Sequence, residues 1–218
     1  MATDRIFILD RSGSMDDCRD DTIGGFNAFV ESQKPFGGTM TLVLFDHEYD
    51  VVYKDKSIEE VEKMTRETYV PRGNTALLDA MGKTIKSVED LLPRTVIVLT
   101  DGHENGSHQY TKAHIKDLVE AKTKEGWTFV YLGANQDAFT EAGALGISQN
   151  CTMNYDVRKT PQAFNRLGAA LSAAASCQGQ AVDLTPTLGD EDDVTSRSPP
   201  PAPQKFSGLG PAPSMANY

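Results

Sequence analysis

The chain has 218 residues, enough for one domain with a sizeable core. Acidic residues outnumber basic residues 31 to 21, which gives a formal net charge of −10. Such a balance offers no basic stripe for a phosphate backbone, so we expect no direct binding to nucleic acid.

The composition changes near Gln178. Residues 1–177 alternate apolar runs with polar segments, whereas residues 178–218 hold seven of the eleven prolines and only scattered apolar side chains. We therefore expect one folded domain over residues 1–177. The acidic and then Pro-rich tail over residues 178–218 is expected to be disordered, because it has too few apolar side chains to form a core.

The cysteines and the apolar segments predict the cellular location of the protein. Cys18, Cys151 and Cys177 show no C-x-x-C spacing, so neither a zinc site nor a disulfide framework is indicated, and their odd number favours a reducing compartment. The first apolar run is broken by Asp10 and Arg11, unlike a signal peptide, and no run reaches transmembrane length. These features predict a soluble cytoplasmic protein that has no membrane partner.

The first predicted element is a strand over Ile6 to Leu9, whose unbroken apolar sequence is typical of a central parallel strand. It ends at Asp10, and Ser12 and Ser14 follow at alternate positions around Gly13. One carboxylate and two hydroxyls spaced in this way can converge on a hard cation such as Mg²⁺. They can equally form a turn in which Asp and Ser bond to their own backbone.

A helix is expected next, because Ile23, Phe26, Phe29 and Val30 fall on one face. Acids in a first turn oppose the helix dipole favourably. Four acids precede or open this helix: Asp16, Asp17, Asp20 and Asp21.

Two strands, Thr39 to Phe45 and Tyr49 to Tyr53, are joined by a short turn and predict an antiparallel hairpin at a sheet edge. Ser57 followed by Glu60 has the spacing of a capping box, which predicts a short helix to about Met64.

The middle of the chain repeats the pattern of a strand that ends in an acid. Gly73-Asn74-Thr75 leads into a helix with apolar residues at helical spacing from Leu77 to Leu92. A β-branched apolar run, Thr95 to Leu99, then ends in Thr100-Asp101-Gly102. Two predicted strands therefore end in aspartates, Asp10 and Asp101.

The last third alternates helices and strands. A helix capped by Thr111, a strand over Trp127 to Leu132, a short helix over Ala138 to Ala144, a weaker strand over Cys151 to Tyr155 and a final helix from Thr160 are expected. The whole order predicts an α/β fold with a doubly wound, mostly parallel six-stranded sheet, one antiparallel edge strand and helices on both faces. Ligands bind such sheets outside the carboxyl ends of the strands, where both aspartates are expected.

Three motifs resemble, in order and approximate spacing, the metal-ion-dependent adhesion site of von Willebrand factor A domains, including integrin inserted domains. They are Asp10-Arg11-Ser12-Gly13-Ser14, Gly73-Asn74-Thr75 and Thr100-Asp101-Gly102. The resemblance covers about residues 3–177 and implies a Rossmann-like fold with a divalent-cation site. It implies that Ser12, Ser14, Thr75 and Asp101 supply oxygen ligands, while Asp10 acts through water or orients the hydroxyls. Mg²⁺ is the implied ion, and Mn²⁺ or Ca²⁺ suits the same ligand types.

The resemblance also implies a function. A cation held largely by neutral hydroxyls accepts the carboxylate of a partner's Asp or Glu as its last ligand. The chain is then a non-enzymatic protein-binding adaptor or scaffold module, similar to small stand-alone microbial or phage members of the family.

Two alternatives stay open. In one, the protein is a structural or assembly component that binds through its last helix or tail, and the metal site is vestigial. In the other, it is a metal-dependent hydrolase with His103 or Glu104 as the base. The sequence lacks the D-x-D-x-T, G-x-x-x-x-G-K-[ST] and G-x-S-x-G patterns that such chemistry commonly uses.

Other polar residues are expected near the site. Arg11 and Arg72 either compensate an acidic rim or are ordinary solvated charges. His47, His108 and His114 share no metal-binding spacing and are expected at the surface. The expected rim residues are Asp16, Asp17, Glu104, Asn105, Asn135, Gln136 and Asp137.

The C-terminal part offers two further patterns. The last helix carries small residues at Gly168-Ala169-Ala170 and Ala173-Ala174-Ala175. Such a surface suits close packing on the sheet or on a partner helix, and we expect it to pack on the core. In the tail, Arg197 precedes a P-x-x-P pattern that is compatible with an SH3-like partner, although a flexible linker has the same composition.

Overall fold

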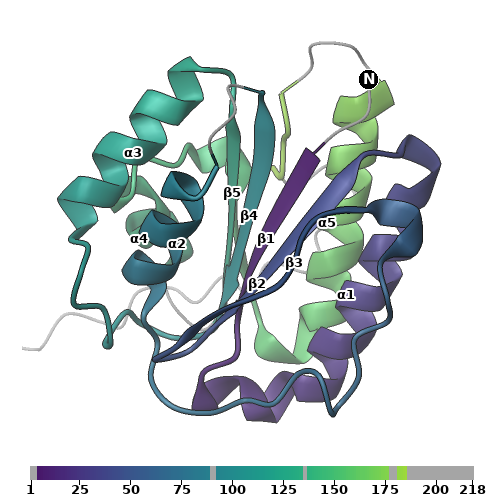
Figure 1. Ribbon diagram of the computed structural model, residues 1–218, viewed down its shortest axis with the longest axis horizontal. Helices are drawn as coiled ribbons and strands as arrows, with labels where there is room; N and C mark the ends of the chain where they lie inside the picture. Colours follow the sequence, from purple (N-terminus) through teal and green to yellow (C-terminus); the bar gives the residue numbers. More distant parts are fainter. Residues whose placement is uncertain (1–3, 89–91, 135–136, 177–180, 186–218) are drawn as a thin grey trace, which may run out of the picture. The chain divides into compact units, whose positions relative to one another are not determined.

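The computed structural model describes residues 4–88, 92–134, 137–176 and 181–185 (Figure 1). Its strands form a six-stranded sheet in the order β3-β2-β1-β4-β5-β6. β3 runs antiparallel to β2, and the other neighbouring pairs are parallel. The predicted doubly wound sheet with an antiparallel edge strand is therefore confirmed.

The strands and helices alternate along the chain much as the apolar runs predict. The strands are β1 (Asp4–Asp10), β2 (Thr39–Phe45), β3 (Tyr49–Ser57), β4 (Arg94–Thr100), β5 (Thr128–Ala134) and β6 (Thr152–Tyr155). The helices are α1 (Arg19–Gln33), α2 (Leu77–Lys86), α3 (Lys112–Lys124), α4 (Ala138–Ala144) and α5 (Thr160–Ser176). Parallel strands need crossover connections, which include α1, α2, α3 and α4, whereas α5 follows the last strand.

The helices lie in two layers, one on each face of the sheet. α1 and α5 pack together on one face, and α2, α3 and α4 cover the other (Figure 1). On the first face, the ring of Phe7 on β1 lies 5.4 Å from Phe26, 5.6 Å from Phe29 and 5.9 Å from Phe164. This aromatic cluster joins α1, β1 and α5 and fills much of that layer.

The contact between α1 and α5 predicts opposite effects for two adjacent glycines. A Cβ at Gly25 would lie 2.3 Å from the ring of Phe164, which is fully buried. We expect Gly25→Ala to lower the free energy of unfolding by about 1–3 kcal/mol through overpacking. A Cβ at Gly24 would meet nothing within 4 Å, so Gly24→Ala should raise it by about 0.5–1 kcal/mol through helix propensity. Urea denaturation measures both, and equal effects at the two positions would contradict this packing.

The predicted helix from Ser57 to Met64 is wrong. Ser57 is the last residue of β3, and only Ile58–Glu60 forms a 3₁₀ turn, without a side-chain cap. The ladder with β2 continues to the Thr39–Ser57 pair, and the backbone N–H of Ile58 then donates to Gly38 at 3.1 Å. Pairing with β2 therefore keeps Ser57 in the sheet, although the local capping pattern would place this residue at the start of a helix.

The long helix predicted up to Leu92 ends earlier. α2 stops at Lys86, where the N–H of Ser87 donates to the carbonyls of Lys83 and Thr84. Leu92 is 58% exposed, so it does not continue the buried face of this helix. Residues 89–91 lie outside the described residues.

A short segment beyond the expected domain boundary, residues 181–185, belongs to the folded unit. Val182 and Leu184 are buried. The N–H of Leu184 donates to the carbonyl of Asn150 at 2.7 Å, and the carbonyl of Leu184 accepts a hydrogen bond from Arg166 on α5. Residues 181–185 thus tie α5 to the segment that leads into β6. The P-x-x-P pattern after Arg197 lies outside the described residues.

Among the small residues of α5, Gly168 is buried against α1 as expected, whereas Ala169 and Ala173 are exposed. A Cβ at Gly168 would lie 2.9 Å from the hydroxyl of Ser32 on α1, and Gln33 donates to the carbonyl of Gly168 at 3.2 Å.

In the described part of the chain, no helix is both long and apolar enough to cross a membrane.

Candidate metal centre

The carboxyl ends of β1 and β4 place the predicted metal residues at one edge of the sheet. β1 ends at Asp10, and the chain then turns through a 3₁₀ helix, η1 (Gly13–Cys18). The segment before α2 lies alongside this turn, because Gly13 N–H donates to Gly73 O at 3.2 Å and Arg72 N–H donates to Arg11 O at 2.7 Å. This pairing brings Thr75 to the same edge.

Four of the five predicted residues form one cluster of oxygen atoms. The hydroxyls of Ser12 and Ser14 are 3.1 Å apart, and Ser14 Oγ donates to Asp101 Oδ1 at 2.6 Å. A Cβ at Gly102 would lie 3.0 Å from Thr75 Oγ1, 3.5 Å from Ser14 Oγ and 3.9 Å from Ser12 Oγ. The three hydroxyls therefore converge beside Gly102, where any side chain would intrude.

Asp10 lies beneath this cluster. One carboxylate oxygen accepts from Ser12 N–H at 2.6 Å, and the other accepts from the Thr100 hydroxyl at 2.5 Å. The buried hydroxyl of Tyr69 donates to the carbonyl of Asp10 at 2.6 Å. The carboxylate of Asp10 thus holds the backbone of Ser12 and the hydroxyl of Thr100 in place.

The two carboxyl groups titrate at higher pH than ordinary aspartates. Burial raises the pKa of Asp10 to about 7, against hydrogen bonds from Thr100 and Ser12, and the charge of Asp101 adds to the rise. Burial also raises the pKa of Asp101, against its hydrogen bond from Ser14. A cation beside these carboxylates would favour their charged forms. The hydroxyl and carboxylate oxygens of this cluster are also the donors that a hard divalent ion such as Mg²⁺ or Mn²⁺ prefers.

The loop after β4 holds Thr75 by hydrogen bonds to both its N–H and its carbonyl group. Its N–H donates to the side-chain oxygen of Asn105 at 2.9 Å. Its carbonyl accepts from the N–H groups of Asn105 and Gly106, each at 3.0 Å. Asn105, expected as a rim residue, therefore positions the Thr75 hydroxyl.

Two acids that organise the loop between β4 and α3 were not foreseen in this role. Glu104 accepts from Leu78 N–H at 3.0 Å, at the start of α2, and from Ser107 N–H at 2.7 Å. Asp79 on α2 accepts from the N–H groups of His108, Gln109 and Tyr110 at 2.9–3.1 Å. Both carboxylates accept hydrogen bonds from backbone N–H groups of an adjacent segment. No local sequence pattern predicts such contacts.

Asp46, at the end of β2, was also missed. Its buried carboxylate accepts from Arg11 Nε at 2.8 Å, Arg72 Nε at 2.9 Å and Glu48 N–H at 2.6 Å. Burial works to raise the pKa of Asp46, but these hydrogen bonds and the positive charges hold it below its usual value. The apolar run before Asp46 resembles those before Asp10 and Asp101 and was the available signal.

Arg11 and Arg72 therefore do not face the hydroxyl cluster as compensating charges. Besides Asp46, Arg11 pairs with Asp50 and Arg72 pairs with Glu48. Both arginines instead join the segments around the cluster through one buried carboxylate.

The remaining candidates divide between the surface and other roles. Asp16 and Asp17 are exposed, as are His47, His103, His108 and His114. Asp137 caps α4 by accepting from Thr140 N–H at 3.2 Å. Asn135 and Gln136 lie outside the described residues.

A second group of possible metal ligands lies close by. Asp46, His47 and Glu48 have ligand atoms within 4.8 Å of one another. The two arginines and the N–H of Glu48 already use the oxygens of Asp46, however, so this group is a poor cation site.

The fold and the oxygen cluster together define a Rossmann-like domain with a candidate divalent-cation site at the carboxyl edge of its sheet. The sequence profile described as the von Willebrand factor type A domain matches residues 4–141. The chain belongs to this family. No curated protein matches it significantly.

Solved structures share the fold at low sequence identity. Proximal thread matrix protein 1 from the mussel byssus, solved with a zinc-occupied MIDAS motif, is similar at 19% identity and a TM-score of 0.57, over 77% of this chain and 45% of that chain. Manganese-loaded Plasmodium vivax TRAP protein is similar at 17% identity and a TM-score of 0.54, over 74% and 71%. The pilus adhesin SpaC from Lactobacillus rhamnosus GG is similar at 13% identity and a TM-score of 0.61, over 77% and 30%. This chain thus spans less than half the length of the first and third of these proteins.

Proposed function

We propose that this domain binds a divalent cation through Asp10, Ser12, Ser14, Thr75 and Asp101 and uses it to capture a carboxylate of a protein partner. The observation that carries the proposal is the convergence of three hydroxyls and the Asp101 carboxylate beside Gly102. Two proteins of similar fold have been solved with zinc or manganese bound. Mg²⁺ is the ion we propose for the cell, since oxygen donors suit it.

The proposed site reaches solvent on one side. Ser12 and Thr75 are buried, whereas Ser14 is exposed and Asp101 is partly exposed. When bound, the cation would supply a Lewis-acidic position for an oxygen of the partner. The chain's own residues hold that position rigidly, because Asp10 and Asn105 fix the segments that carry Ser12 and Thr75.

The proposal is a binding module and not an enzyme. Glu104, one of the two candidate bases for hydrolysis beside His103, uses its carboxylate to accept from Leu78, Gly106 and Ser107 within its own loop and the start of α2. A general base must instead reach the proton that it removes. This engagement of Glu104 supports a role in loop structure.

We propose a cytoplasmic location for the protein. Cys18 and Cys151 are buried and form no disulfide among the described residues, which is usual in a reducing compartment.

The test is capture of partners from a lysate of the native source by the immobilised full chain. Specific partners are expected in Mg²⁺, and EDTA or Asp101→Ala should reduce their recovery at least about tenfold. Adding Mg²⁺ back should restore capture by the wild-type chain and not by the variant.

The same experiment distinguishes carboxylate capture at the metal from the alternative in which the metal site is vestigial. Partners that stay bound in EDTA and also bind Asp101→Ala would show that another surface makes the contact, and the proposed carboxylate capture would be wrong.

A further inference from the structure

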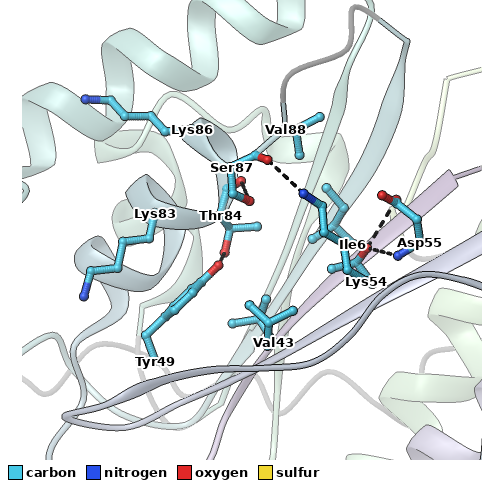
Figure 2. A pocket seen from close by; sticks show the side chains of 12 residues that line it. Ile6, Val43, Tyr49, Lys54, Asp55, Lys83, Thr84, Lys86, Ser87 and Val88 are labelled. Atoms are coloured by element: carbon cyan, nitrogen blue, oxygen red, sulfur yellow. Dashed lines mark hydrogen bonds between the residues drawn. The ribbon is translucent and has the colours of Figure 1, made fainter.

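A second concave site lies on the face of the sheet that α2 covers. It is a pocket of about 560 Å³ between the C-terminal half of α2 and strands β1, β2 and β3 (Figure 2). Ile6, Val43, Val51 and Val88 supply apolar walls from three strands and from the residues after α2. Pockets for small organic ligands commonly have this size and this kind of lining.

The pocket is separate from the candidate metal centre. Its residue on β1 is Ile6, and Asp10 lies four residues further along the same strand. At a rise of about 3.3 Å per residue, the two positions are about 13 Å apart. Tyr49, which also lines the pocket, is nearer to the metal centre because it pairs with Phe45, the partner of Asp10, but the two sites share no side chain.

Lys54 places a cation at the pocket. Lys54 extends from β3 toward the end of α2, and its ammonium donates to the carbonyl of Ser87 at 3.2 Å (Figure 2). An ammonium has three N–H donors, so this bond leaves donors for a ligand. The neighbouring Asp55 pairs with Arg94 at 2.6 Å and is thereby compensated.

The charge around the pocket is opposite to that of the chain. Lys83 and Lys86 also line it, and their ammonium groups lie over the rings of Tyr49 and Tyr110 at 5.6 and 5.1 Å. Three lysines and one paired aspartate thus give a local positive excess in a protein with a net charge of −10. Such a field favours an anionic ligand.

Val51 adds a reason for an apolar ligand. Val51 lines the pocket and yet is 45% exposed, whereas Val43, its partner on β2, and Ile6 on β1 are buried. A ligand with a hydrocarbon body would remove this apolar surface from water.

We propose that this pocket binds a small monocarboxylate with an apolar body, whose carboxylate pairs with Lys54 and whose hydrocarbon part contacts Ile6, Val43, Val51 and Val88. A carboxylate accepts charge-assisted hydrogen bonds from an ammonium, which fixes the orientation of the ligand. The binding is independent of the divalent cation and of the proposed carboxylate capture.

The test is an NMR titration of the methyl-labelled full chain with octanoate, which is ionised at pH 7. Saturable shifts are expected in the methyl groups of Ile6, Val43, Val51 and Val88, with and without EDTA. Octylammonium has the same chain length and the opposite charge, and it should bind at least about tenfold more weakly.

Variants on β3 assign the carboxylate partner. Lys54→Met should weaken octanoate binding about two- to fivefold, because Lys54 is exposed and water screens its pairing with the carboxylate. Lys56→Met is the matched control, because Lys56 lies two residues along the same strand, does not line the pocket and pairs with Glu62. It should leave octanoate binding unchanged.

Three results would each overturn the proposal. They are absence of saturable shifts at these methyl groups, equal binding of octanoate and octylammonium, and undiminished octanoate binding by a folded Lys54→Met variant. Tighter binding of an acetylated Leu-Leu-Asp peptide than of octanoate would assign the pocket to a protein segment instead.

Discussion

Replacing Asp101 with alanine is expected to weaken Mn²⁺ binding at least about tenfold, as loss of a charged ligand costs well over 1 kcal/mol. Asp101 accepts from Ser14 and adds a full negative charge to a cluster of otherwise neutral hydroxyls. The electron paramagnetic resonance signal of free Mn²⁺, followed during titration of the protein, measures the affinity directly.

The matched control for that variant is Asp117→Ala, which removes an exposed acid on α3 and changes the net charge equally. It should bind Mn²⁺ as the wild type does. If Asp101→Ala bound Mn²⁺ as tightly as Asp117→Ala, Asp101 would not belong to a cation site.

Replacing Asp46 with alanine is expected to lower the free energy of unfolding by about 3–5 kcal/mol at pH 7. The variant would leave Arg11, whose side chain is only 10% exposed, without its buried partner, and would also remove a partner of Arg72. Urea denaturation measures the change. Asp50→Ala is the control, because Asp50 also pairs with Arg11 but is 50% exposed, and it should cost at most about 1 kcal/mol.

The effect of Asp46 should depend on pH. The folded state holds the pKa of Asp46 below its usual value, so the folded protein binds fewer protons at this group than the unfolded chain does. Its contribution to stability is then complete above about pH 4 and is lost as the pH falls through the folded-state pKa. The difference between wild type and Asp46→Ala should therefore shrink in acid, and a difference that grew in acid would contradict this assignment.

The sheet was predictable because each central strand is buried on both faces. β1 and β4 are continuous apolar runs, and the intervening helices have clear apolar faces. The errors came where tertiary pairing replaced a local signal. The capping pattern of Ser57 and Glu60 predicts a helix, but pairing between β2 and β3 extends to Ser57 and no α-helix forms there.

The boundary at residue 177 missed a short contribution to the core. Val182 and Leu184 alternate with polar neighbours, as in an extended segment, but their composition resembles that of the tail. Their burial depends on Asn150 and Arg166, which are distant in the sequence.

The candidate site was predictable as a list of residues and only partly as a structure. Three short motifs place Ser12, Ser14, Thr75 and Asp101 at strand ends or loop starts, and the structure brings their oxygens together. The supporting contacts of Asp46, Asp79 and Glu104 join segments 26–35 residues apart. Such pairings follow from the fold and have no local periodicity.

The most direct measurement of the central claim is an anomalous difference map from crystals of the domain grown with Mn²⁺. The account predicts one strong peak within about 2.0–2.4 Å of Ser12 Oγ and Ser14 Oγ, close to Thr75 and Asp101. A peak at Asp46, His47 and Glu48, or no peak beside Gly102 at saturating Mn²⁺, would contradict it.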